Sequence, residues 1–263
     1  MPVSSKKFEE ITNCKNSSLY FNKFAFSKIS NSDNNNEITS KILSKLSNSG
    51  VKVQEANLRK DVLINSLKKN RSLKVIDIVL RTKHRFLIGA GSPSAYEVGF
   101  HFDRNNGYPV IPGSSLKGAF FHFLEDEALA TRNTRFGADS GKIRKWQGFS
   151  DETGEGGESG KGEISFLDAI PCGNLRLERD IINNHFTKYY DEKSILPPND
   201  WYEPIPVTFI AVAKNTKMRF SLVLRKEDYS NQDFEEIQRL FKEMLSDWGV
   251  GAKTAYGYGR FTE

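Results

Sequence analysis

Hydrophobic residues recur at close to helical spacing in the first quarter of the chain, in two groups: Ile38, Ile42 and Leu46, and then Leu58, Val62 and Leu67. Residues three or four apart share one face of an α-helix. The pattern therefore predicts helices over Glu37–Leu46 and Val53–Leu67. We expect both to belong to an N-terminal helical extension, residues 1–74, that packs on the core.

The hydrophobic pattern changes after residue 74. Val75–Gly91 is rich in β-branched residues and ends in a glycine turn, which predicts a strand. Another strand is predicted over Glu163–Pro171. Two further apolar runs, Val207–Lys214 and Met218–Arg225, flank a short polar turn, and this arrangement predicts an antiparallel hairpin.

Two helices and a short final strand complete the pattern. Apolar residues form one helix face from Ser115 to Leu129 and another from Phe234 to Trp248. This order of strands and helices predicts an α+β domain over residues 75–263, with a ferredoxin-like (RRM-like) core and an antiparallel sheet covered by helices on one face. Dense glycines from Asp139 to Gly162 predict a flexible insertion in it.

Composition narrows the class of protein. The chain has 263 residues, 38% hydrophobic and 27% charged, which is typical of a globular protein with a sizeable core. It lacks the apolar run of about 18 residues that a membrane span needs, and its start lacks the apolar region of a secretory signal. Two distant cysteines, Cys14 and Cys172, favour a reducing cytoplasm. The net charge of +5 permits a polyanionic partner without demonstrating one.

The segment Ile111–Phe121, IPGSSLKGAFF, places a turn and polar residues directly before an apolar helix. Its Pro-Gly pair predicts the turn, and Ser114 or Ser115 predicts a helix cap. Free N–H groups at the helix start, a serine hydroxyl and Lys117 have the chemistry of an anion site. The alternative is a capped helix that binds no ligand.

The second motif, GVGAKTAYGYGRF, stands at the end of the sequence and contains four closely spaced glycines: Gly249, Gly251, Gly257 and Gly259. Glycine lets a backbone lie close to a ligand or to another segment. Lys253 and Arg260 supply positive charge, and tyrosine rings can stack on bases. The alternative is a turn and a strand with packed tyrosines. The motif is not a phosphate-binding P-loop, because Ala252 separates the glycine from the lysine.

Together these motifs resemble those of the RAMP superfamily of CRISPR proteins, with YPVIPGSSLKGA before a helix and GVGAKTAYGYGRF at the end. FGADSG (Phe136–Gly141) and ISFLDAIP (Ile164–Pro171) match two further segments of the family. RDIINNHFTKYY (Arg179–Tyr190) and the following WYEPIPVTFIAV resemble one branch of it, the sixth subunit of the Cmr complex, a type III-B CRISPR effector. The resemblance covers roughly Val75–Phe261.

The resemblance implies a ferredoxin-like core with a glycine-rich loop before the last strand. It also implies a subunit that binds guide (CRISPR) RNA, meets target RNA, and caps the backbone filament toward the guide's 3′ part beside other RAMP subunits of the Cmr effector complex. The family's cutting residue lies in the repeated backbone subunit, so no enzymatic activity is implied. The matched motif residues, with Tyr256 and Arg260, form the predicted RNA-binding set: Gly113, Ser114, Ser115, Lys117, Gly118, Gly249, Gly251, Lys253, Thr254, Tyr256, Gly257, Tyr258, Gly259 and Arg260.

Two alternatives remain open. One is a RAMP-type endoribonuclease that uses Asp103 and His101, which lie in the loop before the first motif. The other is a capping module that contacts only neighbouring proteins. The sequence has no C-x-x-C pair and no H-E-x-x-H segment, so we predict neither a metal site nor a cofactor.

Overall fold

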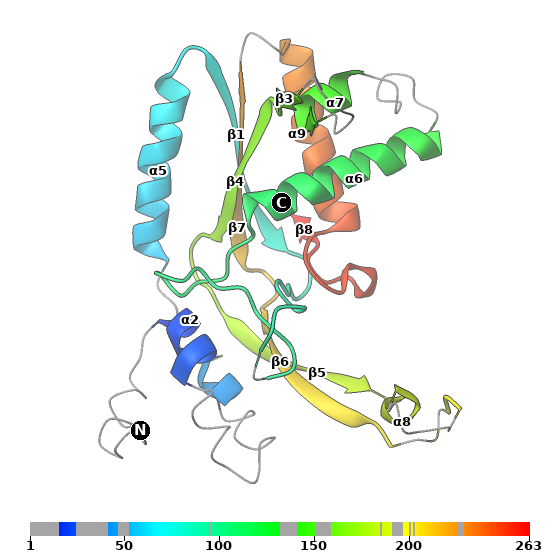
Figure 1. Cartoon of the computed structure of the whole chain (residues 1–263). Coiled ribbons are helices and arrows are strands. Elements are labelled where there is room, and N and C mark those ends of the chain that lie inside the picture. The colour runs from blue at the N-terminus through cyan, green and yellow to red at the C-terminus, as the bar shows by residue number, and fades with distance from the viewer. Residues whose placement is uncertain are drawn as a thin grey trace.

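The computed structural model describes residues 16–24, 42–46, 53–94, 96–131, 141–150, 159–184, 186–190, 197–199, 201, 203–225 and 229–263. It combines helices with antiparallel sheets, as predicted (Figure 1). The central sheet has four strands in the order β4-β7-β1-β8. Their bounds are Ile164–Pro171 for β4, Lys217–Arg225 for β7, Leu73–Thr82 for β1 and Phe261–Thr262 for β8.

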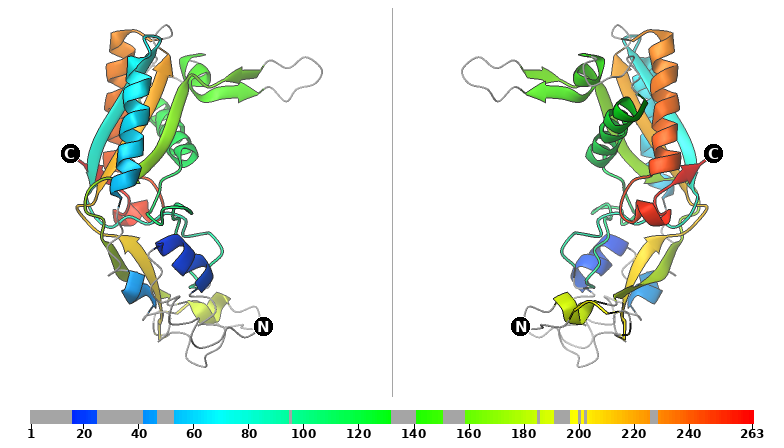
Figure 2. Two further views of the ribbon diagram at one scale, coloured as in Figure 1. Left: turned by 90° about the vertical axis from the view of Figure 1, so that its left-hand side faces the viewer. Right: turned by 90° about the vertical axis from the view of Figure 1, so that its right-hand side faces the viewer.

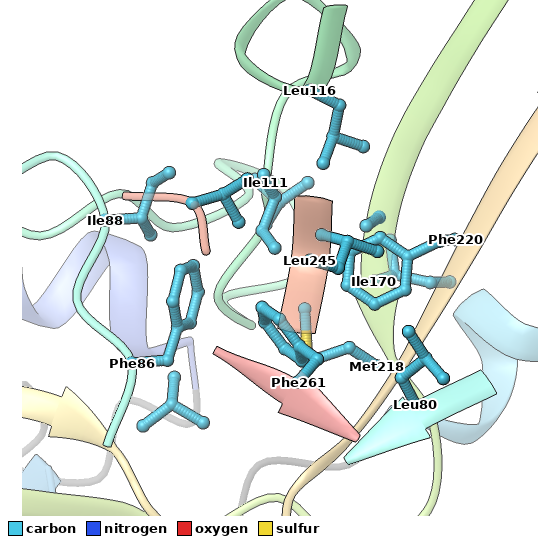
Figure 3. Packing of buried hydrophobic residues seen from close by; sticks show 14 of the residues in the cluster. Leu80, Phe86, Ile88, Ile111, Leu116, Ile170, Met218, Phe220, Leu245 and Phe261 are labelled. Carbon is cyan, nitrogen blue, oxygen red and sulfur yellow. The ribbon is translucent and has the colours of Figure 1, made fainter. Parts of the chain in front are cut away.

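The two faces of the central sheet differ in polarity. Ile76 and Leu80 of β1, and Met218 and Phe220 of β7, are buried and alternate with more exposed residues. Successive side chains of a strand point to opposite faces, so these residues form one apolar face. The core lies against it, and Figure 3 shows how Phe86 and Phe261 from outside these two strands join it.

Three helical segments cover this apolar face: α6 (Gly113–Thr131), α9 (Asn231–Glu243) and the π-helix η3 (Met244–Trp248) (Figure 1). Phe120 of α6 and Phe220 of β7 both pack their rings against Phe241 of α9. A capping box between Ser230 and Asp233 starts α9. The helices predicted at 115–129 and 234–248 are thus confirmed, with α6 and α9 each beginning two or three residues earlier.

The opposite face of the sheet is covered by α5 (Gln54–Lys69), the helix predicted over Val53–Leu67 (Figure 1). Lys60 is buried there and donates to the backbone oxygens of Asp168, at 2.6 Å, and Arg219, at 3.3 Å. Of the other predicted helix, Glu37–Leu46, the structure describes residues 42–46, and these are helical.

The start of the described chain packs on the loop before α6. It comprises α2 (Ser17–Leu19) and the π-helix η1 (Tyr20–Phe24). The Asn16 side chain caps α2 and also donates to the backbone oxygen of Asn105 at 2.8 Å. The Phe21 ring stacks on Tyr96, with 4.6 Å between ring centroids. The described parts of residues 1–74 thus share the core of the rest.

A long hairpin extends away from the central sheet (Figures 1 and 2). It pairs β5 (Leu177–Asn184) with β6 (Ile205–Val212), and the short helix α8 (Thr187–Tyr190) lies beyond β5. The prediction that Val207–Lys214 pairs with Met218–Arg225 was wrong.

The physical reason for this difference lies in the turn between β6 and β7. Thr82 at the end of β1 donates its hydroxyl to Ala213 O at 2.9 Å and accepts from Thr216 N–H at 3.0 Å. The Asn215 N–H donates to Thr82 O at 3.0 Å. The turn therefore wraps around β1, and β7 enters the sheet between β1 and β4 while β6 leaves it.

Two other predicted segments also differ from the structure. The strand predicted over Val75–Gly91 ends at Thr82. Beyond it, the N–H groups of Lys83 and Phe86 donate to the backbone oxygens of Arg260 and Val212, which lie outside β7. The predicted loop Asp139–Gly162 contains the helix α7 (Gly141–Gln147) and a pair of short strands, β2 (Gly148–Ser150) and β3 (Ser159–Lys161). Glycine density alone predicted a loop there, and residues 151–158 lie outside the described chain.

Candidate nucleic-acid interface

The IPGSS motif forms the start of α6, pressed against β4. Ile111 bridges Ala169, and a Cβ added to Gly113 would lie 2.1 Å from the backbone oxygen of Phe166. Such contact is too close for any side chain, so the approach of the helix to β4 requires glycine. The Gly113 N–H donates to Asp168 Oδ1 at 2.7 Å and is therefore used within the chain.

The prediction that Ser114 or Ser115 caps this helix was wrong. The helix begins at Gly113, so both serines lie inside its first turn and are exposed. The carboxylate that accepts from the helix start comes from Asp168, which is distant in sequence. Gly118 is also exposed, and Lys117, which is half-buried, has no ion pair within the described chain. Outward-facing groups of the first motif thus surround a helix N-terminus, which favours anions.

The glycine-rich loop lies between η3 and β8, and its glycines allow it to fold tightly on itself. Gly249, Gly251, Gly257 and Gly259 all have positive φ angles. A Cβ on Gly259 would lie 1.9 Å from Val250 O, and one on Gly251 would lie 2.3 Å from Leu87 O. The N–H groups of Ala252 and Gly259 donate to Leu87 O and Arg85 O. Close packing within the chain accounts for these glycines.

Three consecutive backbone N–H groups of the loop have no partner within the described chain: those of Lys253, Thr254 and Ala255. Lys253 has left-handed backbone angles, and the 3-10 helix η4 (Thr254–Tyr256) follows it directly. Successive N–H groups in such a turn form a concave site for an anion. The next side chain, Tyr256, is 84% exposed. This loop therefore places open backbone donors next to an exposed ring, and aromatic rings are groups on which bases can stack.

Other predicted residues of the loop are held against the β5–β6 hairpin. The Lys253 ammonium lies over the ring of Phe209, 4.8 Å from its centroid, and burial lowers the pKa of this ammonium. The Tyr258 hydroxyl donates to Asp180 of β5. Arg260 is half-buried, and its Nε has no hydrogen-bond partner within the described chain. Lys253 and Tyr258 thus bind the hairpin and lie in the same loop as the open N–H groups.

A cluster of charged residues that sequence reasoning missed completes this junction. Arg85 pairs with Glu178 Oε2 at 3.2 Å and with Asp180 Oδ2 at 3.1 Å. The two acids stand two residues apart in LERDIINN, so they share one face of a strand. That spacing was the available signal, but the strand itself was not predicted. The cluster joins the β5–β6 hairpin to Arg85, whose backbone oxygen accepts from the Gly259 N–H of the glycine-rich loop.

The two motifs lie on neighbouring elements. Trp248, directly before the loop, packs edge-on against His122 and Phe123 of α6, with 5.6 Å between ring centroids in both pairs. Figure 1 shows the loop, in red, below the first turns of α6. The structure therefore brings the motifs to one region.

Of the alternative nuclease residues, Asp103 has a structural role in this chain. Asp103 Oδ1 accepts from the N–H groups of Asn105 and Asn106, at 3.1 and 2.7 Å, and so closes a tight turn. His101 is exposed on the strand-like segment before it. Within the described ranges, no group of three or more His, Cys, Asp and Glu side chains is arranged to hold a metal ion. His185 lies outside these ranges.

Comparisons with known proteins agree on one family. The model of the RAMP superfamily matches residues 79–262. The chain is 32% identical over 238 residues to the CRISPR system Cmr subunit Cmr6 of Pyrococcus furiosus, covering 73% of this chain and 69% of that protein. It is 25% identical over 198 residues to the Cmr6 subunit of Saccharolobus solfataricus, covering 73% of this chain and 59% of that protein.

A solved structure supports the same fold. A chain of the type III-B Cmr-beta complex bound to cognate target RNA superposes with a TM-score of 0.67 at 21% identity, covering 96% of this chain and 92% of that one. At this identity the likeness speaks for the fold alone. Among the described residues, none of the helices is long and apolar enough to cross a membrane.

Proposed function

Because this chain belongs to the RAMP superfamily, we propose that it is a non-catalytic RNA-binding subunit of a type III-B CRISPR (Cmr) effector complex. In this role it binds the guide RNA toward its 3′ part, meets target RNA and caps the backbone filament beside other RAMP subunits in the cytoplasm. The similarity to two Cmr6 subunits, each over 73% of this chain, supports this assignment.

The observation that carries the proposal is the group of unpartnered N–H donors at Lys253, Thr254 and Ala255, next to the exposed ring of Tyr256. Backbone donors bind a phosphate without reading a base, which suits a subunit that must accept guides of any sequence. Specificity then comes from base pairing between guide and target. The exposed face of the first α6 turns adds a second place for the RNA backbone.

We further infer a ferredoxin-like core. The strand order β4-β7-β1-β8, with α6 between β1 and β4 and α9 between β7 and β8, corresponds to two interleaved strand–helix–strand units. Both helices lie on one face of the sheet (Figure 1). The β5–β6 hairpin and the segment containing α7 are insertions between the strands of this core.

The absence of catalysis is part of the proposal. The Asp103 carboxylate accepts three hydrogen bonds from its own turn, including one of 2.7 Å from Asn106 Nδ2. All three hydrogen bonds go to Oδ1, so this oxygen closes the turn, and we propose no catalytic role for the side chain. We therefore assign Asp103 to the loop that binds Asn16, at the start of the described chain.

The test is a gel-shift titration of a labelled guide RNA across a salt series, read for both binding and cleavage. Lys253→Asn removes the charge and keeps a residue that tolerates the left-handed backbone, and Lys117→Ala removes the second cation. Lys69→Asn, at the exposed end of α5, is the matched control. We expect weaker binding and a salt slope lower by about 1 for each interface lysine removed.

Three other results would contradict parts of the proposal. Full affinity in the double variant would remove the site assignment. Cleavage that Asp103→Ala abolishes would establish the nuclease alternative. Unchanged RNA affinity with lost assembly into the complex would favour a module that contacts only neighbouring proteins.

A further inference from the structure

Strand β1 is paired along one edge and largely open along the other. On one side, residues Leu73–Arg81 pair with β7. On the other side, only Arg81 and Thr82 pair, with the two residues of β8. Within the described chain, no other strand pairs with Leu73–Leu80 on that side. An open edge presents a row of backbone donors and acceptors to which another extended segment can add.

Two hydrogen bonds show which backbone groups face this open edge. The Thr82 N–H donates to Thr216 O, on the β7 side, and the Lys83 N–H donates to Arg260 O, on the β8 side. Backbone groups of successive strand residues point to opposite edges, so the odd-numbered residues of β1 face the open side. Three such residues have no backbone partner within the described chain on that side: Val75, Asp77 and Val79.

A groove of about 360 Å³ follows the same edge. Four consecutive residues of β1, Ile78–Arg81, line it together with Lys217, Lys242 and Glu263. Because the lining residues are consecutive, the groove runs along the strand edge. Val79 is 47% exposed although it lies in the middle of the sheet's longest strand. Figure 2 shows this edge of β1 at the margin of the molecule.

Lys242 and Glu263 of the groove pair with each other at 2.6 Å, and the remaining charges beside it favour an anionic occupant. Arg81 and Lys217 stand directly opposite each other on β1 and β7, both are exposed, and neither has an ion pair within the described chain. Like charges directly opposite across a sheet repel each other. Arg219, two residues along β7, shows the contrast, because it pairs with Asp77 at 2.8 Å.

We propose that the open edge of β1 is the docking site for an extended acidic segment of a partner polypeptide. The segment adds as a strand beside Val75–Val79, sets an apolar side chain against Val79, and directs a carboxylate toward Arg81 and Lys217. Such strand addition obtains affinity from backbone hydrogen bonds and selectivity from alternate side chains. The row of unpartnered backbone groups favours a polypeptide over RNA, which cannot continue a β-ladder. This site is independent of the proposed RNA-binding loop.

The test uses the full chain and a fluorescent blocked peptide of alternating valine and glutamate. Anisotropy gives its affinity, and hydrogen exchange follows the amides of Val75, Asp77 and Val79. We expect binding that protects these three amides and that falls at least about tenfold with Arg81→Glu plus Lys217→Glu. Lys69→Glu serves as the charge control. The same peptide N-methylated at alternate residues should not bind, because it cannot complete the ladder.

Val79→Pro separates backbone pairing from charge. Proline is tolerated where the lost N–H faces an open edge, and circular dichroism checks that the variant folds. We expect it to abolish peptide binding. Equal binding of the N-methylated peptide, or no binding at all, would overturn the proposal. The proposal would also be overturned if replacing Arg81 and Lys217 weakened RNA binding but not peptide binding. A homodimer that Val79→Pro dissociates would overturn it as well.

Discussion

The backbone N–H of Gly113 donates a hydrogen bond of 2.7 Å to Oδ1 of Asp168. Asp168 lies where the pairing of β4 with β7 shifts register, between Leu167 and Ile170. Its backbone oxygen accepts from Lys60 Nζ at 2.6 Å. One irregular position in β4 thus ties the start of α6, on one face of the sheet, to α5 on the other.

Replacing Asp168 should loosen the start of α6. We expect Asp168→Ala to lower the free energy of unfolding by about 1–2 kcal/mol, because the Gly113 N–H loses its acceptor. Asp168→Asn retains a side-chain oxygen and should lose less. Urea unfolding with both variants measures the difference, and equal losses would show that the hydrogen bond contributes nothing.

Two glycines with positive φ separate backbone strain from close packing. Gly173 (φ 89°) has nothing within 4 Å of an added Cβ, whereas Gly259 (φ 65°) would place that Cβ 1.9 Å from Val250 O. Gly173→Ala should cost about 1–2 kcal/mol through its backbone alone. Gly259→Ala should cost clearly more, because the loop must also open. Thermal and urea unfolding decide this, and similar losses would contradict the packing account.

Gly118, in α6, is a glycine whose replacement by alanine should stabilise the protein. It is exposed, and nothing lies within 4 Å of an added Cβ. Gly118→Ala should therefore raise the free energy of unfolding by about 1 kcal/mol and the melting temperature by about 2–4 °C. Gly113→Ala is the matched control and should destabilise the protein. A stabilised Gly118→Ala protein with weaker RNA binding would place Gly118 at the RNA, and an unstable one would refute the prediction.

Lys60 should make stability depend on pH in the alkaline range. Burial lowers the pKa of its ammonium to about 8 from the usual 10.5, and the attraction of Asp77 opposes this only in part. Between these values the unfolded chain binds more protons than the folded one, so the free energy of unfolding rises with pH. Lys60→Met should lack this rise. Urea unfolding from pH 7 to 10.5 tests it, and parallel curves for the two proteins would contradict it.

The sequence identified the helices α5, α6 and α9 and the core strands well because the relevant signals are local. The apolar spacing in α5, α6 and α9 and the β-branched run of β1 depend only on neighbouring residues. Prediction failed where distant residues compete for a partner. Thr82 binds the turn at residues 213–216, so Val207–Val212 pairs with β5 in place of β7.

For the candidate site, too, local features could be predicted from the sequence and long-range contacts could not. The sequence by itself determined that the chain carries two glycine-containing motifs and that Lys253 and Tyr256 belong to one of them, because residue type and order suffice for this. Only the tertiary structure decided which groups remain available. Asp168 Oδ1 accepts from the Gly113 N–H, and the backbone oxygens of Leu87 and Arg85 accept from two N–H groups of the loop. The N–H groups of residues 253–255 have no partner within the described chain. Hydrogen bonds between residues far apart in sequence depend on distances that only the folded chain sets.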